Sequence, residues 1–135
     1  MTETRKVAAD ITWGIIAALL LHIVMITLAV AWVAFYSYVL DPGHDRGFYE
    51  AYAGRSSPIV SLIAGGPVFY LASAWLTRRR GNARSAWIAA ALYLVSDLAV
   101  FAAVGGIAAT VALAFLSGAV LKLAGTALGA RLADA

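Results

Sequence analysis

The apolar stretch at residues 85–104 constrains the fold of this chain more than any other part of its sequence. A run of about 20 apolar residues is long enough to cross the roughly 30 Å hydrocarbon core of a bilayer as a helix. One carboxylate, that of Asp97, interrupts this run. An ionised aspartate at the centre of a spanning helix costs about 2.5–3.5 kcal/mol on insertion scales. Asp97 must therefore face other helices, water or a partner, or it must be protonated.

The composition extends this inference from one stretch to the whole chain. The 135 residues are 63% hydrophobic and only 13% charged, whereas soluble domains are about half apolar and a quarter charged. A soluble domain this apolar would need a larger core than its length can enclose. Lipid removes the contradiction, and in lipid only helices or closed barrels satisfy every backbone polar group. The sequence therefore predicts a single all-α integral membrane domain.

The apolar stretches predict an antiparallel bundle of four membrane-spanning helices. We expect spans at about residues 11–40, 58–76, 85–104 and 107–130, with an external loop at 41–57 and a basic loop at 77–84. Stretches of this kind have the length that a spanning helix needs at a rise of about 1.5 Å per residue. The fourth span ends either near Lys122 or near Ala130, depending on whether the lysine lies inside it.

The charge pattern predicts how the bundle lies in the membrane. Four arginines between the second and third spans serve as topology determinants: Arg78, Arg79, Arg80 and Arg84. Together with the basic residues near both chain ends, they fall on one side of a four-span bundle, and the positive-inside rule makes that side cytoplasmic. We therefore expect cytoplasmic N- and C-termini, a location in the cell (inner or plasma) membrane, and contact of the basic loop with anionic lipid headgroups. The net charge of +3 is thus assigned to topology and not to nucleic-acid binding.

Four polar residues within the spans form a candidate intramembrane site: His22, Ser96, Asp97 and Lys122. Counted from the predicted inner ends, the histidine, the aspartate and the lysine all lie about 13–18 Å deep. His22 or Lys122 could stabilise an ionised Asp97, because an unpaired charge is costly in a low dielectric. In the alternative interpretation, His22 hydrogen-bonds a neighbouring helix and Lys122 extends to the inner headgroups.

A candidate helix break lies at a similar depth in the second span, at Gly65, Gly66 and Pro67. The proline removes a backbone hydrogen bond and clashes with the preceding turn. The two glycines permit either close approach of another helix or a locally unwound segment. Broken helices at the midplane accompany substrate or ion sites in transporters, whereas a packing kink is the alternative interpretation.

The sequence carries no motif that indicates catalysis. It has no phosphate-binding glycine loop, no zinc signature and no nucleophile elbow, and it contains no cysteine. We therefore expect no enzymatic activity, no cofactor and no metal site.

The polar residues leave more than one function open. We expect an accessory, structural or assembly protein whose intramembrane polar residues lock its helices together. The alternative is an oligomeric proton- or ion-coupled small transporter or channel that uses Asp97 and His22. An enzyme acting on a lipid or quinone has the least support. Gly125 and Gly129 fall on one helix face, which predicts a homo-oligomer or a membrane-protein partner.

Overall fold

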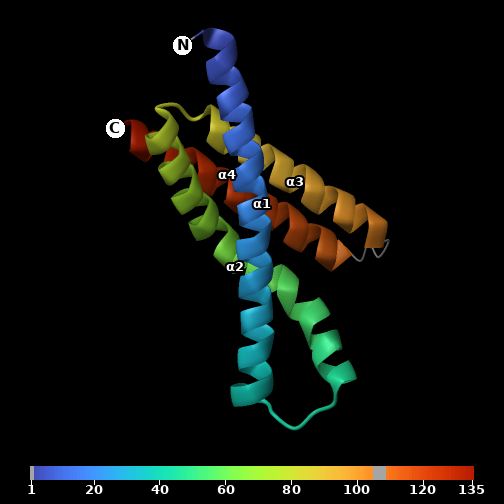
Figure 1. The fold of residues 1–135 in the computed structure, drawn as a ribbon. Coiled ribbons are helices and arrows are strands. Elements are labelled where there is room, and N and C mark those ends of the chain that lie inside the picture. Colours follow the sequence, from blue (N-terminus) through green and yellow to red (C-terminus); the bar gives the residue numbers. More distant parts are fainter. Residues whose placement is uncertain (1, 105–108) are drawn as a thin grey trace.

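The computed structural model describes residues 2–104 and 109–135, and within them it contains four long helices (Figure 1). Their bounds are α1 (Glu3–Phe35), α2 (Arg46–Arg80), α3 (Arg84–Val104) and α4 (Ala109–Asp134), and a π-helical turn, η1 (Tyr36–Leu40), extends α1. Each of the four helices is long and apolar enough to cross a membrane. The predicted all-α class with four membrane-length helices is confirmed, and the described residues contain no strand.

Consecutive helices run in opposite directions. Figure 1 shows both chain ends and the α2–α3 turn at one end of the molecule, and the α1–α2 connection at the other. α2 crosses α1 obliquely and packs most closely on α4, whereas α3 packs mainly on α1. α3 and α4 make few contacts with each other. The two helix pairs that pack best, α2 with α4 and α1 with α3, are therefore not neighbours in the sequence.

α2 begins at Arg46, well before the predicted second span, so most of the segment 41–57 that the sequence assigns to an external loop is helical. The Asp45 side chain caps the helix by accepting a hydrogen bond from the Phe48 backbone N–H at 2.9 Å. The following turns are held on α1, because Trp32 Nε1 donates to the Tyr52 hydroxyl at 2.9 Å and Tyr36 stacks on Tyr52. The segment 46–57 is therefore helical, and only residues 41–45 connect α1 and η1 to α2.

α2 also ends later than predicted, which corrects the basic loop at 77–84. Arg78, Arg79 and Arg80 form its last turn, where the helix dipole favours positive charge. Gly81 ends the helix with a φ of +67°, a left-handed conformation that glycine adopts without strain. Only residues 81–83 connect α2 to α3.

The glycines of α2 and α4 serve close packing inside the chain. α2 continues as an α-helix through residues 65–67, so the predicted helix break is absent. A Cβ added at Gly125 would overlap the carbonyl oxygen of Gly66, and one added at Gly129 would overlap that of Tyr70. The glycine face of α4 that the sequence predicts as an association surface therefore packs against α2 of the same chain.

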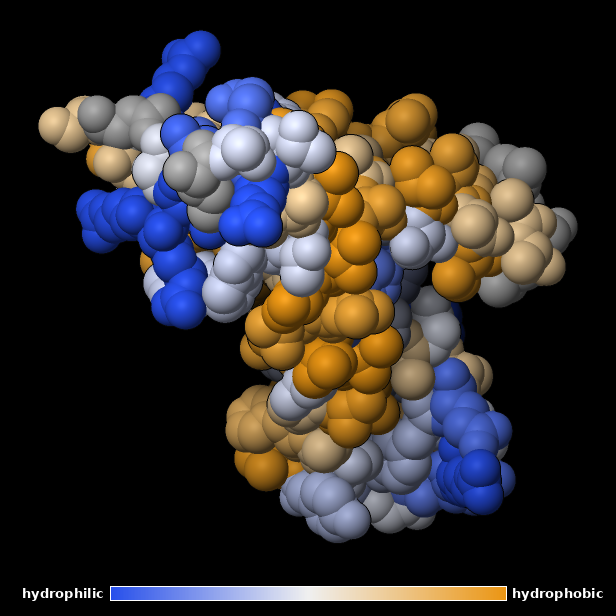
Figure 2. All heavy atoms as spheres, turned by 45° about the horizontal axis from the view of Figure 1, so that its top comes forward, coloured by the Kyte–Doolittle hydropathy of each residue, from blue (hydrophilic) through white to orange (hydrophobic). Residues whose placement is uncertain are grey.

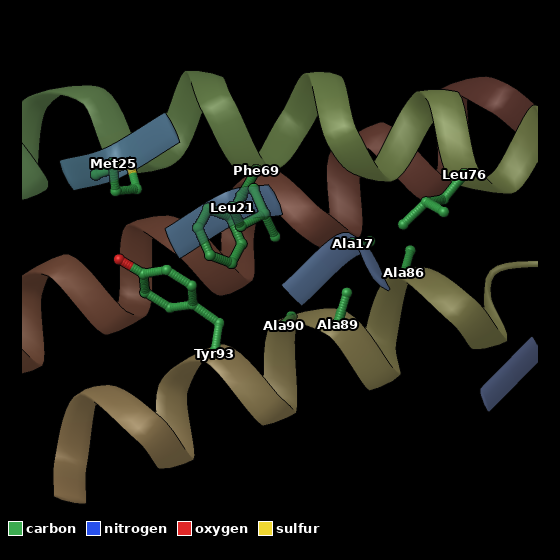
Figure 3. Close-up of a cluster of buried hydrophobic side chains, with 9 residues drawn as sticks. All are labelled: Ala17, Leu21, Met25, Phe69, Leu76, Ala86, Ala89, Ala90 and Tyr93. Carbon is green, nitrogen blue, oxygen red and sulfur yellow. The ribbon is translucent and has the colours of Figure 1, made fainter. Parts of the chain in front are cut away.

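The apolar core lies between α1, α2 and α3, and other apolar side chains face outward. Figure 3 shows Leu21 and Met25 of α1 together with Phe69 of α2 and Tyr93 of α3. Many large apolar side chains are exposed on all four helices. Figure 2 shows this surface as an apolar band with hydrophilic residues gathered at both ends of the molecule. Such a distribution suits a chain surrounded by lipid, where apolar side chains face outward at no cost.

Candidate functional site

The centre of the candidate site is Lys122, whose side chain is only 3% exposed in the middle of α4. The absence of a side chain at Gly65 makes room for it. A Cβ at Gly65 would lie 3.0 Å from both Cγ and Cε of Lys122. The aliphatic stem of the lysine thus runs along α2, and its ammonium group is held inside the bundle.

The ammonium group of Lys122 is bound by three other helix-borne side chains. Lys122 Nζ donates to Asp97 Oδ2 of α3 at 3.1 Å and to Ser61 Oγ of α2 at 2.9 Å. It also lies 5.0 Å from the centre of the Tyr93 ring, within the range of a cation–π interaction. We call these four residues, Ser61, Tyr93, Asp97 and Lys122, the Lys122 cluster. The cluster joins α2, α3 and α4 at one point.

The charges of the Lys122 cluster balance each other. A buried cation without a partner is strongly unfavourable in a low dielectric, and the adjacent carboxylate of Asp97 supplies the compensating charge. The two side chains differ in exposure, because Asp97 is 31% exposed whereas Lys122 is 3% exposed. The lysine is therefore enclosed within the bundle, whereas the carboxylate of Asp97 is the accessible member of the pair.

The accessible side of Asp97 faces a cavity of about 620 Å³. All four helices contribute to its wall, which is mostly apolar. Figure 2 shows a recess between the lobe formed by the far ends of α3 and α4 and the lobe formed by the α1–α2 connection. The residues that line the cavity include Met25, Val30, Ser57, Ser61, Phe101 and Phe115, besides Asp97 and Lys122. The few contacts between α3 and α4 explain why a space of this size remains there.

His22 and Ser96, the other two predicted site residues, lie outside the cluster. His22 Nδ1 lies 2.7 Å from the Ala18 carbonyl of its own helix, and its ring lies against that of Tyr93 with centres 4.2 Å apart. Ser96 Oγ donates to the Leu92 carbonyl. Of the two partners considered for Asp97, His22 or Lys122, the structure brings Lys122 to it and leaves His22 apart. The proposal that Lys122 extends to the headgroups is wrong for this structure, since its side chain is enclosed.

Sequence reasoning missed Ser61 and Tyr93 as members of the site. Ser61 stands four residues before Gly65, one turn earlier on the same helix face. Tyr93 stands four residues before Asp97, so these two residues also share one face of α3. This spacing was available in the sequence once Gly65 and Asp97 were singled out.

A second charged cluster lies at the end of the molecule that carries the termini. The Asp10 side chain is only 1% exposed, and it accepts a hydrogen bond from Arg80 Nε at 2.8 Å. Asn82 Nδ2 and Ser85 Oγ also donate to it, at 3.3 and 3.4 Å, and Arg84 lies 3.5 Å away. This Asp10 cluster ties the start of α1 to the α2–α3 turn. Two of the four arginines predicted as topology determinants are thus bound within the chain.

The other two of these arginines, Arg78 and Arg79, lie outside the Asp10 cluster. Arg78 is exposed, and the Arg79 guanidinium lies 4.5 Å from the centre of the Trp13 ring and 5.4 Å from that of Trp75. Arg79 therefore combines an exposed charge with aromatic contacts at this end of the molecule.

The described residues offer no group of three or more His, Asp and Glu side chains that could hold a metal ion. The chemistry of the Lys122 cluster is accordingly that of an ion pair and hydrogen bonds at the edge of an apolar cavity. No protein-family model, curated protein or solved structure matches this chain.

Proposed function

We propose that this chain is a small multi-pass protein of the cell membrane that serves an accessory, structural or assembly role. The Lys122 cluster carries this proposal. It connects α2, α3 and α4, and it is among the few contacts between α3 and α4 in the described residues. An ion pair of this kind determines how helices are arranged more than it adds to their stability.

The distribution of charge supports an orientation with both termini in the cytoplasm. Both chain ends and the turn after Arg80 lie at the same end of the molecule. Arg78 and Arg79 are exposed there, and Trp13 and Trp75 lie beside them. Cationic and indole side chains together are typical of a cytoplasmic membrane interface, where anionic headgroups bind the cations.

A partner would have to bind away from the glycine face of α4. That face is occupied by α2, so a second copy of the chain or another membrane protein would use the exposed apolar surface instead. Partner binding at that surface fits an accessory role, because it leaves the internal ion pair undisturbed.

The second candidate function is proton- or ion-coupled transport in an oligomer. The observation that favours it is the 31% exposure of Asp97 within a cavity. A carboxylate that is partly accessible could exchange a proton or an ion between Lys122 and the cavity. His22 would contribute only through its contact with Tyr93, since it does not contact Asp97.

A double-mutant cycle on the ion pair tests the structural role. Asp97→Asn leaves the enclosed Lys122 cation without its partner, which costs about 3–5 kcal/mol for a buried pair. The double variant with Lys122→Met removes both charges, and we expect it to recover most of the lost stability. The measurement is thermal unfolding in detergent micelles, followed by tryptophan fluorescence.

The exposed pair of Arg46 and Glu50 supplies the matched control. Their side chains are 92% and 63% exposed, with Nε and Oε1 2.6 Å apart. The same cycle with Arg46→Met and Glu50→Gln should give a coupling of at most about 0.5 kcal/mol. The structural role is refuted if the Asp97 cycle gives a coupling as small as this control. In that event, a proton or ion flux in proteoliposomes that Asp97→Asn abolishes would establish the transport candidate.

A further inference from the structure

We infer that the cavity beside Asp97 is a binding site for a neutral lipophilic molecule that carries a hydroxyl group. The inference concerns the open side of Asp97, and it is independent of the structural role proposed for the ion pair. It rests on the size of the cavity, on the type of polar atom that faces it, and on the charge balance of its wall.

The cavity has the size and lining of a small-molecule site. Its volume of about 620 Å³ falls within the roughly 300–1,000 Å³ that such sites occupy. Most of the wall is apolar, and Phe101 of α3 stacks on Phe115 of α4 with ring centres 5.1 Å apart. The polar side chains of the lining are Ser57, one turn before Ser61, and the four residues of the Lys122 cluster, which contact one another around the ammonium group. A ligand with an apolar body and one polar group matches this division.

The polar side of the cavity presents an acceptor. Asp97 Oδ2 accepts the hydrogen bond from Lys122, whereas Oδ1 accepts none from the residues that the structure describes. The Ser57 hydroxyl donates to the Ala53 carbonyl at 2.7 Å, which leaves its oxygen as a further acceptor. A carboxylate oxygen forms stronger hydrogen bonds than a neutral acceptor, especially away from water. The wall also carries hydroxyl donors at Ser61, whose oxygen accepts from Lys122, and at Tyr93. A ligand hydroxyl can donate to Asp97 and accept from such a donor, so a hydroxyl group fits here better than a group that only accepts.

The charge of the wall decides between a charged and a neutral donor. The ammonium of Lys122 and the carboxylate of Asp97 already cancel each other. A ligand with a net charge would add an uncompensated charge in an apolar cavity, which is costly. A neutral alcohol or phenol supplies the donor without that cost. The recess in the apolar surface in Figure 2 allows such a molecule to enter from the lipid.

The test compares two probes that differ only in the donated hydrogen. The wild-type chain is placed in phosphatidylcholine nanodiscs, and excess binding over empty nanodiscs is measured for radiolabelled dodecan-1-ol and for its methyl ether. We expect saturable binding of one dodecanol per chain, with at least tenfold weaker binding of the ether, because the ether cannot donate to Asp97. Dodecylammonium should bind no better than the alcohol.

Three variants show whether the difference in binding between the alcohol and the ether arises in this cavity. Ala114→Leu places a larger side chain in the cavity wall and should reduce dodecanol binding at least tenfold. Ala102→Leu, at an exposed position outside the cavity, should leave binding unchanged. The double variant Asp97→Leu with Lys122→Met keeps the wall neutral but removes the acceptor, so alcohol and ether should bind alike.

The inference is overturned by any of three results. These are equal binding of alcohol and ether to the wild-type chain, tighter binding of dodecylammonium, or equal loss of binding in the Ala114 and Ala102 variants. None of these results changes the expected outcome of the double-mutant cycle on the ion pair. The ligand site and the structural role of the ion pair can therefore be refuted independently of each other.

Discussion

Replacement of Gly125 or Gly129 by alanine tests whether α4 packs on α2 of the same chain. The sequence pattern alone predicts that these glycines bind another chain, whereas the structure places them against α2. The two arrangements give opposite expectations for the stability of a monomer. Gly→Ala is the smallest change that separates them, because it adds one methyl group.

The expected magnitude follows from the atoms that the new methyl groups would meet. At Gly125 the Cβ would overlap the Gly66 carbonyl oxygen and lie 3.2 Å from the Tyr70 backbone nitrogen. At Gly129 it would overlap the Tyr70 carbonyl oxygen and lie 3.0 Å from the backbone nitrogen of Ala74. These are backbone atoms, so the helices themselves must move apart. Overpacking of this kind destabilises the folded chain by about 1–3 kcal/mol. The higher helix propensity of alanine offsets up to about 1 kcal/mol of this loss.

With the full gain in helix propensity subtracted, we expect each substitution to lower the free energy of unfolding by up to about 2 kcal/mol. The hydrogen bond from Ser73 Oγ to the Thr126 carbonyl, 2.7 Å long, crosses the same interface and would be stretched. The assay is unfolding in mixed micelles of rising dodecyl sulfate fraction, followed by tryptophan fluorescence. Light scattering on the same samples gives the oligomeric state.

Gly54→Ala is the control for the helix-propensity contribution. Gly54 lies in α2, and a Cβ there would meet no atom within 4 Å. We expect this variant to be more stable by about 0.5–1 kcal/mol. The reasoning is refuted if Gly125→Ala and Gly129→Ala leave the monomer as stable as Gly54→Ala does, and instead dissociate an oligomer.

Two further predictions concern the ends of the bundle. Asp10→Asn should lower the free energy of unfolding by about 1.5–3 kcal/mol, because the buried carboxylate accepts a charged hydrogen bond from Arg80. Unfolding in micelles measures this loss, and Glu3→Gln, at an exposed position, is the control. In the connection at 41–45, hydrogen bonds from Tyr36 and His44 lower the pKa of Asp41. Ionised Asp41 therefore stabilises this connection above the ordinary carboxyl pKa of about 3.9, and the contribution is lost as the pH falls through the lowered pKa. An NMR titration of Asp41 should have its midpoint below that ordinary value, and Tyr36→Phe should move it upward.

The number of helices could be predicted from the sequence, but the starts of α1 and α2 and the end of α2 could not. Four apolar stretches of spanning length predict four helices, because lipid excludes unpaired backbone groups. The start of α2 depends on contacts that hydropathy does not contain. Asp45 caps the helix, and Tyr52 is held by Trp32 and Tyr36 of the preceding helix. At the other end, Gly81 stops the helix only after its three arginines.

Counting residues predicts how far along its helix each residue of the candidate site lies, but not which way its side chain points around the helix axis. Counting residues along each span placed Asp97, Lys122 and His22 at similar depths, and two of the three do meet. Depth does not state which way a side chain points around its helix. His22 turns toward Tyr93 and its own backbone, and it does not contact the carboxylate.

The glycines at 65 and 66 show how one pattern supports two interpretations until the neighbouring helix is known. Beside a proline, they indicate a broken helix and a cavity-facing backbone. In the structure the helix is continuous, and the missing side chain at Gly65 is replaced by the stem of Lys122. Gly66 allows α4 to approach closely at Gly125, which holds Lys122 at that level. The glycines, the lysine and the carboxylate of Asp97 thus form one packing unit, in which a lysine could be enclosed only because the facing helix carries no side chain there.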